Sequence, residues 1–292
     1  RAARYGVSVV DGPEYETVGT YAALLGSSDL EGAAYASHLC NRLGLDTISA
    51  GSTIAFAYYL YNQGLLSQEA TGGLDLQWGD MGPALQLTEQ MARREGLGDL
   101  LAEGARRVGK ALGVEHLAVH VKGLELPMHD PRAFAGLALV YATSPRGACH
   151  MAGDIYMVTQ GQVVPELGID SDDRLDQSPA AVQVAARLMD WRSVTNGLIL
   201  CHFANPPLEQ VLGLLNAATG AEWDADRLRQ VLLNLASNAL AFTPADGRVE
   251  FHLDRKNGHA QLEVVDTGIG IAPEVLPRVM DRFVRGDPSR NR

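Results

Sequence analysis

Apolar positions recur at helical spacing along most of the chain up to about residue 220, and this predicts a series of amphipathic helices. Glycines and prolines mark the ends of several of these segments, because glycine commonly follows a helix and proline suits its first turn. The predicted helices cover residues 29–43, 52–66, 83–95, 99–112, 179–192 and 208–218. Residues 114–162 instead combine glycine, proline and short apolar runs, which predicts loops around a site.

The pattern changes near Trp223. Residues 226–242 keep one apolar face with a period of about 3.6 residues, as a helix requires. Residues 248–254 and 259–266 then alternate between apolar and polar positions on either side of an Asn-Gly pair, which favours a tight hairpin turn. A helix followed by a hairpin is the pattern of an α+β layer.

Two regions are therefore predicted. Residues 1–222 form a mainly α region, and residues 223–292 form a partial α+β sandwich. The two meet abruptly at residues 221–224, without a low-complexity linker between them.

Composition excludes some classes of protein. The net charge of −11 disfavours a nucleic-acid or anionic-membrane partner, since both need clustered Lys and Arg. We find no apolar run of the roughly 18–20 residues that span a bilayer, and no apolar segment of a signal peptide follows the first residues. The three cysteines are odd in number and far apart, which argues against a disulfide framework and favours a reducing cytoplasm.

Several short motifs carry residues suited to redox chemistry. They are 12–17 (GPEYET), 41–47 (NRLGLDT), 74–80 (LDLQWGD), 96–104 (GLGDLLAEG), 143–150 (TSPRGACH) and 197–203 (GLILCHF). In this order they resemble the aldehyde ferredoxin oxidoreductase family over residues 5–223, through its middle and C-terminal helical domains. Each motif alone would be weak, and their order makes the resemblance specific.

The resemblance implies an enzyme that oxidises small aldehydes to carboxylic acids. It implies tungsten, or molybdenum in some relatives, held by two pterin dithiolenes. It also implies a 4Fe-4S cluster that passes electrons to ferredoxin. A homodimer is one assembly open to such a chain. Oxidation of an aldehyde releases two electrons and two protons, so an acid/base group is needed beside the metal.

The resemblance assigns roles to individual residues. Glu16 and His150 match the family's acid/base positions. We expect a raised pKa for a carboxylate beside a dianionic metal-dithiolene site, and a histidine there can donate a proton to a metal-bound oxygen. Cys201 matches the last thiolate ligand of the cluster.

A pterin-contacting motif of the form D-x-x-G-L-D is matched by Asn41, Gly44, Leu45 and Asp46, with its first Asp replaced by Asn. Arg146 is a further cofactor-binding candidate. Each candidate also has a structural interpretation. Asp46 could simply cap a helix, a lone His could be a hydrogen-bonded core residue, and a Cys in an apolar run is usually a small buried hydrophobe.

The cluster requires four thiolates. In the family a C-x-x-C-x-x-x-C run precedes the GPEYET segment, and this sequence begins at Arg1 without such a run. The family's N-terminal β-rich domain, on which the pterins sit, is also missing from the sequence. We therefore expect an incomplete cofactor cavity in this chain.

The last third carries a second set of candidates. Asn234 and Asn238 share one face of the predicted helix, and a carboxamide oxygen suits Mg²⁺. Asp266 can accept a hydrogen bond from an adenine amino group, while Gly268 and Gly270 let the backbone approach the base.

These residues resemble the N, G1 and F boxes of sensor histidine kinase ATPase domains, at 227–244, 266–270 and 281–285. The resemblance implies that Asn238 holds Mg²⁺, Asn234 supports the phosphates and Asp266 reads adenine. Ala241 stands where the family usually has Lys or Arg, and the sequence ends at Arg292, before the second glycine-rich box. We find no recognisable phospho-accepting histidine, so we do not expect phosphotransfer by this chain alone.

Three functional hypotheses follow. The first is a tungsten- or molybdenum-pterin aldehyde oxidoreductase. The second is a nucleotide-binding module of a two-component sensor histidine kinase. The third is a chimeric join in which neither activity survives. Whether the chain is an enzyme depends on which of these holds.

Overall fold

The computed structural model describes residues 2–170, 173–201, 207–220, 235, 238–239, 242–244, 247–256, 259–271, 273 and 276. The chain divides into two compact units. The first comprises Arg1–Pro165 with Ile169–Ala185, and the second comprises Glu166–Gly168 with Ala186–Arg292. No helix of the described part is long and apolar enough to cross a membrane.

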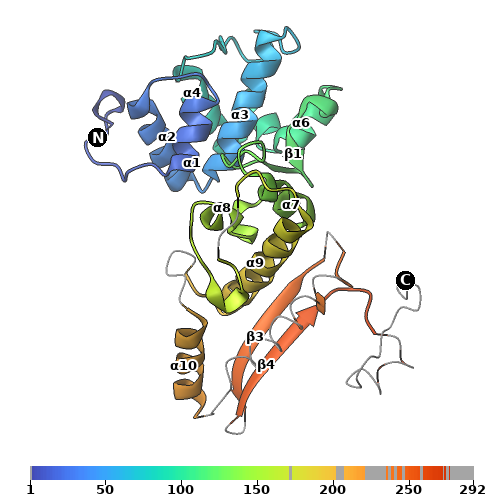
Figure 1. Cartoon of the computed structure of the whole chain (residues 1–292). Coiled ribbons are helices and arrows are strands. Elements are labelled where there is room, and N and C mark those ends of the chain that lie inside the picture. The colour runs from blue at the N-terminus through green and yellow to red at the C-terminus, as the bar shows by residue number, and fades with distance from the viewer. Residues whose placement is uncertain are drawn as a thin grey trace. The chain divides into compact units, whose positions relative to one another are not determined.

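The first unit begins as a bundle of helices around an apolar core (Figure 1). Its central helices α2, α3 and α4 pack against one another. The core includes the fully buried side chains of Tyr21, Ile54, Tyr58 and Leu87. The elements of this part are η1 (Ala3–Tyr5), α1 (Tyr15–Val18), η2 (Gly19–Ala23), α2 (Leu30–Leu43), α3 (Thr47–Asn62), α4 (Gly82–Arg93), α5 (Gly96–Leu101) and α6 (Ala105–Ala111).

Local sequence determines where α2 and α3 begin. The Asp29 side chain caps α2 by accepting from the Gly32 amide at 2.9 Å, and Gly44 ends it in the left-handed conformation at φ +73°. The Asp46 carboxylate caps α3 by accepting from the Ser49 amide at 2.8 Å. The predicted helix at 29–43 is confirmed, and the one at 52–66 begins earlier because Asp46 supplies an N-cap.

The single helix predicted for 99–112 is wrong. Two helices, α5 and α6, stand there, separated at Gly104 with φ +85°. The first amide of α6, that of Ala105, donates to the buried Glu125 carboxylate at 2.7 Å, and Thr53 donates to the same oxygen at 3.3 Å. The Glu125 carboxylate, which is distant in sequence, therefore accepts from the amide that would otherwise bond to a carbonyl within a continuous helix. The local sequence pattern does not reveal this contact.

The rest of the first unit is more regular than predicted. Strands β1 and β2 form a small antiparallel pair, and α7 packs against α8. Helix α7 is apolar on nearly all its faces, so it lacks the amphipathic period that predicts a helix. The elements are η3 (Glu115–Leu117), β1 (His120–Val121), β2 (Leu124–Glu125), α7 (Ala135–Thr143), η4 (His150–Ala152), α8 (Ile155–Val158) and η5 (Pro165–Leu167), the last continuing into the second unit.

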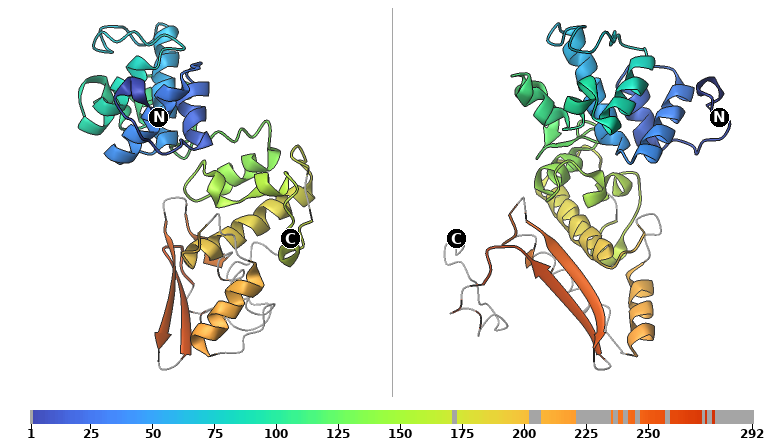
Figure 2. Two further views of the ribbon diagram at one scale, coloured as in Figure 1. Left: turned by 90° about the vertical axis from the view of Figure 1, so that its left-hand side faces the viewer. Right: turned by 180° about the vertical axis from the view of Figure 1, so that it is seen from behind.

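The second unit contains a long antiparallel hairpin of β3 (Val249–Lys256) and β4 (His259–Asp266), drawn in Figure 2. Its register runs from the Val249–Asp266 pair to the Lys256–His259 pair. The predicted hairpin is confirmed, although its Asn-Gly turn lies outside the described residues. Helices α9 (Pro179–Gly197), which begins in the first unit, and α10 (Leu208–Thr219) confirm the two helices predicted there.

The last turn of α9 packs closely on β3. A Cβ at Gly197 would lie 2.7 Å from the Phe251 Cβ, so only glycine allows this approach. The helix predicted for 226–242 falls mostly outside the described residues. Its described positions Leu235, Asn238, Ala239 and Phe242 are helical.

Candidate functional site

Glu16 is held in place by contacts between α1, η2 and α3. Thr17 Oγ1 donates to Thr47 Oγ1 at 3.0 Å, and Thr20 Oγ1 donates to the Thr47 carbonyl at 3.1 Å. A Cβ at Gly51 would lie 2.6 Å from the Thr20 side chain, so glycine is needed for α3 to pack this closely. Glu16 is therefore buried, with 4% of its surface exposed, on a fixed backbone.

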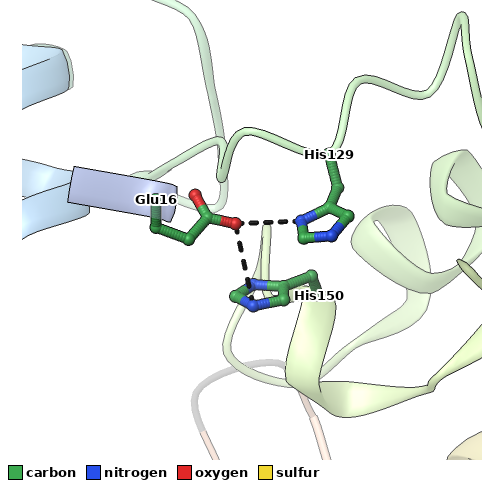
Figure 3. Close-up of side chains that lie close together, drawn as sticks. All are labelled: Glu16, His129 and His150. Atoms are coloured by element: carbon green, nitrogen blue, oxygen red, sulfur yellow. Dashed lines mark hydrogen bonds and ion pairs between the residues drawn. The ribbon is translucent and has the colours of Figure 1, made fainter. Parts of the chain in front are cut away.

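A loop after β2 holds both oxygens of the Glu16 carboxylate. The Met128 amide donates to Oε2 at 2.7 Å, and Nδ1 of His129 lies 2.9 Å from Oε1 (Figure 3). A Cβ at Gly19 would lie 2.3 Å from the Met128 side chain, so glycine lets this loop reach the carboxylate. Successive residues of one loop thus determine the orientation of the carboxylate.

His150, at the start of η4, completes the cluster. Its Nε2 lies 3.7 Å from Glu16 Oε1, and its ring stacks on that of His129 with centroids 4.8 Å apart and planes inclined by 16°. Figure 3 shows both imidazoles directed toward the same carboxylate oxygen. The two residues predicted as catalytic, Glu16 and His150, are thus brought together by the fold.

Four residues of this site escaped the sequence analysis: His129, Tyr15, Tyr141 and Tyr156. The Tyr15 hydroxyl lies 3.4 Å from Nε2 of each histidine. Tyr141 donates to the His129 carbonyl at 2.8 Å, and the Tyr156 ring centroid lies 4.5 Å from that of His129. The signal that could have indicated His129 is its place two residues from a proline on either side, which favours a rigid loop.

The electrostatics of Glu16 differ from the sequence-based expectation. Burial acts to raise the pKa of its carboxyl, but the hydrogen bonds from His129 and the Met128 amide, with the charge of the histidines, outweigh burial. The pKa of Glu16 is therefore lowered, whereas a raised pKa was expected beside an anionic metal site. In the chain itself the neighbours that lower the pKa of Glu16 are the Met128 amide and the two histidines.

The nearby tyrosines are held as neutral hydrogen-bond donors. Burial, followed by the charge of Glu16, raises the pKa of both Tyr15 and Tyr141. Each phenol therefore stays protonated at neutral pH. Glu16 is then the anionic member of a cluster whose other members can donate.

The cluster also has the composition of a metal site. Glu16, His129 and His150 offer one carboxylate and two imidazoles, and their ligand atoms lie within 4.8 Å of one another. In this structure Nδ1 of His129 lies 2.9 Å and Nε2 of His150 lies 3.7 Å from the same oxygen of the Glu16 carboxylate. The geometry is that of a hydrogen-bonded acid/base cluster.

Of the residues predicted to bind the pterin, Asp46 is linked to the segment that carries Glu16 through its chain neighbour Thr47. Asp46 immediately precedes Thr47, the residue that anchors α1 and η2. Asn41, Asp46 and Arg146 are exposed, Leu45 packs on the core, and Gly44 ends α2. Their exposed polar side chains suit a polar cofactor, although Asp46 also serves as the cap of α3.

The chain's cysteines do not fit a 4Fe-4S cluster. Such a cluster needs four ligands, usually thiolates, and the chain has three cysteines. Cys40 and Cys149 are buried in the first unit, where Cys40 contacts the Tyr21 hydroxyl at 3.4 Å. Cys201, the predicted ligand, is exposed and belongs to the second unit.

The predicted nucleotide-binding residues are partly described. Asp266 ends β4, is exposed, and accepts from the Gly268 amide at 2.8 Å. A Cβ at Gly268 would lie 2.5 Å from the Phe242 carbonyl, and Gly270 has φ +73°. Asn238 is exposed on a helical position, and Asn234 lies outside the described residues. The glycines thus permit the turn that the motif requires.

Comparison with known families finds two matches, which overlap at residues 223–242. The family described as "Aldehyde ferredoxin oxidoreductase, domains 2 & 3" matches residues 1–242. The family described as "Histidine kinase-, DNA gyrase B-, and HSP90-like ATPase" matches residues 223–292. Both resemblances drawn from the motifs are confirmed.

Curated relatives agree. The tungsten-containing aldehyde ferredoxin oxidoreductase of Pyrococcus furiosus is 38% identical over 221 residues, which is 75% of this chain and 35% of that protein. The enzyme of the same name from Thermococcus kodakarensis is 36% identical over the same shares. The histidine protein kinase DivJ of Caulobacter vibrioides is 42% identical over 101 residues, 34% of this chain and 15% of that protein. The chain spans about a third of the length of the oxidoreductase relatives.

A solved structure shows a shared fold. The active site complex BamBC of benzoyl coenzyme A reductase in complex with 1,5 dienoyl-CoA matches with a TM-score of 0.58 and 21% identity. The match covers 78% of this chain and 40% of that chain. The mainly α fold with a partial α+β end is confirmed.

Proposed function

The chain belongs to the aldehyde ferredoxin oxidoreductase family, and on that premise we propose that it supplies the acid/base site of an enzyme that oxidises aldehydes to carboxylic acids. The observation that carries the proposal is the buried Glu16 carboxylate held between His129 and His150. An ionised carboxylate in contact with two imidazoles is equipped to take up and release protons near neutral pH.

The cofactor implied by the family is tungsten or molybdenum held by two pterins. Exposed polar residues of the matched motifs would suit it: Asn41 and Asp46 with the adjoining Gly44 and Leu45, and Arg146 on the loop that leads to His150. When bound, this group accepts the two electrons that leave the aldehyde. The protons that leave with them require protein groups.

Glu16 is proposed as the first of these groups. Its lowered pKa keeps it ionised near neutral pH, so its carboxylate can accept a proton transiently and pass it to a neighbouring imidazole. His150 Nε2, 3.7 Å from the same carboxylate oxygen, can hold a proton or return it to solvent. Tyr15 lies against both histidines and supplies a neutral donor.

Ferredoxin is proposed as the electron partner, by analogy with the name of the relatives. The cysteines of this chain do not fit an iron-sulfur cluster, so no electron-transfer step is assigned to them. Cytoplasmic location and a homodimer stay predictions of the same kind.

Substitution of Glu16 tests the proposal. In the whole protein loaded with its cofactor, E16Q should reduce kcat for aldehyde oxidation by about 10²–10⁴-fold, because general acid/base groups contribute about that much. The exposed His116 offers a matched control, and H116Q should leave kcat unchanged. Tungsten and molybdenum content should be measured in every variant. Full turnover by E16Q at equal metal content would refute the proposed role.

A second function is proposed for the region matched from residue 223, namely binding of ATP with Mg²⁺. The observation that favours it is the Asp266–Gly268 turn at the end of β4, whose glycine fits closely against the Phe242 carbonyl. We place the boundary between the two regions at 222/223. A join with neither activity is the third interpretation, and activity in either test would exclude it.

A further inference from the structure

We infer that His129 is a positioning residue for Glu16: it fixes the carboxylate oxygen on which His150 converges. Nothing in the sequence motifs or in the family match assigns a role to this histidine. The inference rests on the proposed function of Glu16 and His150, and it deepens that function by naming the group that sets their geometry.

One loop holds the Glu16 carboxylate at both oxygens. Met128 and His129 are adjacent in sequence, and they contact Oε2 and Oε1 at 2.7 and 2.9 Å. Two contacts from one rigid segment prevent rotation of the carboxylate about its terminal bond. Without the His129 contact, Oε1 would be free to turn away from His150.

His129 is itself held by its neighbours. Its carbonyl accepts from Tyr141 at 2.8 Å, its ring lies against Tyr156 and meets the edge of Tyr15, and its own side chain is only 10% exposed. These contacts leave the ring no alternative position. Because the His129 ring is held in place, it determines the position of the Glu16 Oε1 atom that it contacts.

The contacts of His129 also depend on which of its ring nitrogens carries the proton. With its proton on Nδ1, His129 donates to Glu16, and its Nε2 can then accept from the Tyr15 hydroxyl at 3.4 Å. The His150 ring stacks on it at 4.8 Å, so two charges on the pair would repel each other.

The titratable groups that the described residues place near Glu16 all enter this balance. They are His129 and Asp130 on the loop after β2, Glu14 and Tyr15 beside it on the chain, Tyr141 on α7, Cys149 and His150 at η4, and Tyr156 on α8. Of these only His129 both contacts the carboxylate within hydrogen-bond distance and can carry positive charge. It is accordingly the group whose removal should alter Glu16 most.

The test is a carboxyl-carbon NMR titration of the full 292-residue chain labelled at glutamate, with E16Q used to identify the Glu16 signal. H129L removes both the hydrogen bond and the charge, so the acid dissociation constant of Glu16 should fall about tenfold, the equivalent of about one pKa unit. H129Q keeps a neutral N–H donor and should recover part of that change. H116Q, an exposed histidine, should leave the titration of Glu16 as in the wild type.

Circular dichroism decides whether each variant is folded. If H129L does not fold, H129Q carries the test, and its Glu16 must still bind its proton more tightly than in the wild type. A Glu16 titration unchanged in folded H129L or H129Q would overturn the inference, even if stability falls, since a purely structural histidine would change stability alone.

The titration requires no cofactor, so it separates this inference from the proposed function. If E16Q turns over normally in the loaded enzyme while H129L shifts the titration, the proposed function fails and the positioning role stands. If E16Q is inactive in the loaded enzyme and the Glu16 titration is unchanged in H129L, the proposed function stands and the positioning role fails.

Discussion

At the scale of single residues, the proposed acid/base site rests on one buried carboxylate. Glu16 is ionised in spite of burial because the Met128 amide and His129 hold its two oxygens. A buried charge is stable only when its hydrogen-bonding capacity is satisfied. The same contacts that prepare Glu16 for proton transfer therefore contribute to folding.

This coupling predicts a pH-dependent stability. The folded-state pKa of Glu16 lies below the ordinary value of 4.5, so its contribution is present above that value and is lost as pH falls through the lowered pKa. Near neutral pH, E16Q should lower the free energy of unfolding by about 1–3 kcal/mol, the cost of a hydrogen bond made to a charged group. The difference should shrink in acid. Urea denaturation at several pH values measures it, and a difference independent of pH would contradict the assignment.

At the scale of elements, the fold depends on glycines that let segments approach closely. Gly147 has φ +95°, and a Cβ there would lie 2.2 Å from the Val121 carbonyl of β1. Gly147 therefore lets the loop that carries Arg146 lie against the β1–β2 pair. The same loop leads on to His150. Few other positions in the first unit combine left-handed backbone with so close a contact.

Gly161 provides the matched comparison, since it has φ +97° with no atom near the Cβ position. G161A should cost about 1–2 kcal/mol of stability from backbone strain alone. G147A should cost about 1–3 kcal/mol more, from the clash with the Val121 carbonyl. Chemical denaturation of both variants measures the difference, and equal losses would show that the loop can move away from β1.

At the scale of the whole molecule, two families with unrelated chemistry are matched by one chain. If the second region binds nucleotide, it should do so without the metal cofactor of the first. A fluorescent ATP analogue with Mg²⁺ should bind the full chain, and D266N should weaken binding at least about tenfold through loss of the adenine contact. E263Q, an exposed change on the same strand, should have no effect. The absence of binding at millimolar nucleotide would remove this function.

The sequence by itself determined the helices with clear caps, such as α2 with Asp29 and Gly44, and the β3–β4 hairpin, because these depend on contacts between near neighbours. The family motifs in the sequence also indicated Glu16 and His150 as candidate acid/base residues, which the fold places next to each other. Motifs and periodicity report local preference, and local preference is sufficient for these features.

Only the tertiary structure decided the break between α5 and α6, the helix at α7 and the presence of His129 beside Glu16. Each depends on a partner distant in the chain: Glu125 for the start of α6, neighbouring elements for an all-apolar helix, and the carboxylate of Glu16 for His129. The pKa of Glu16 was likewise decided by the surrounding donors. A single sequence carries no record of which distant groups meet, because that depends on how the whole core packs.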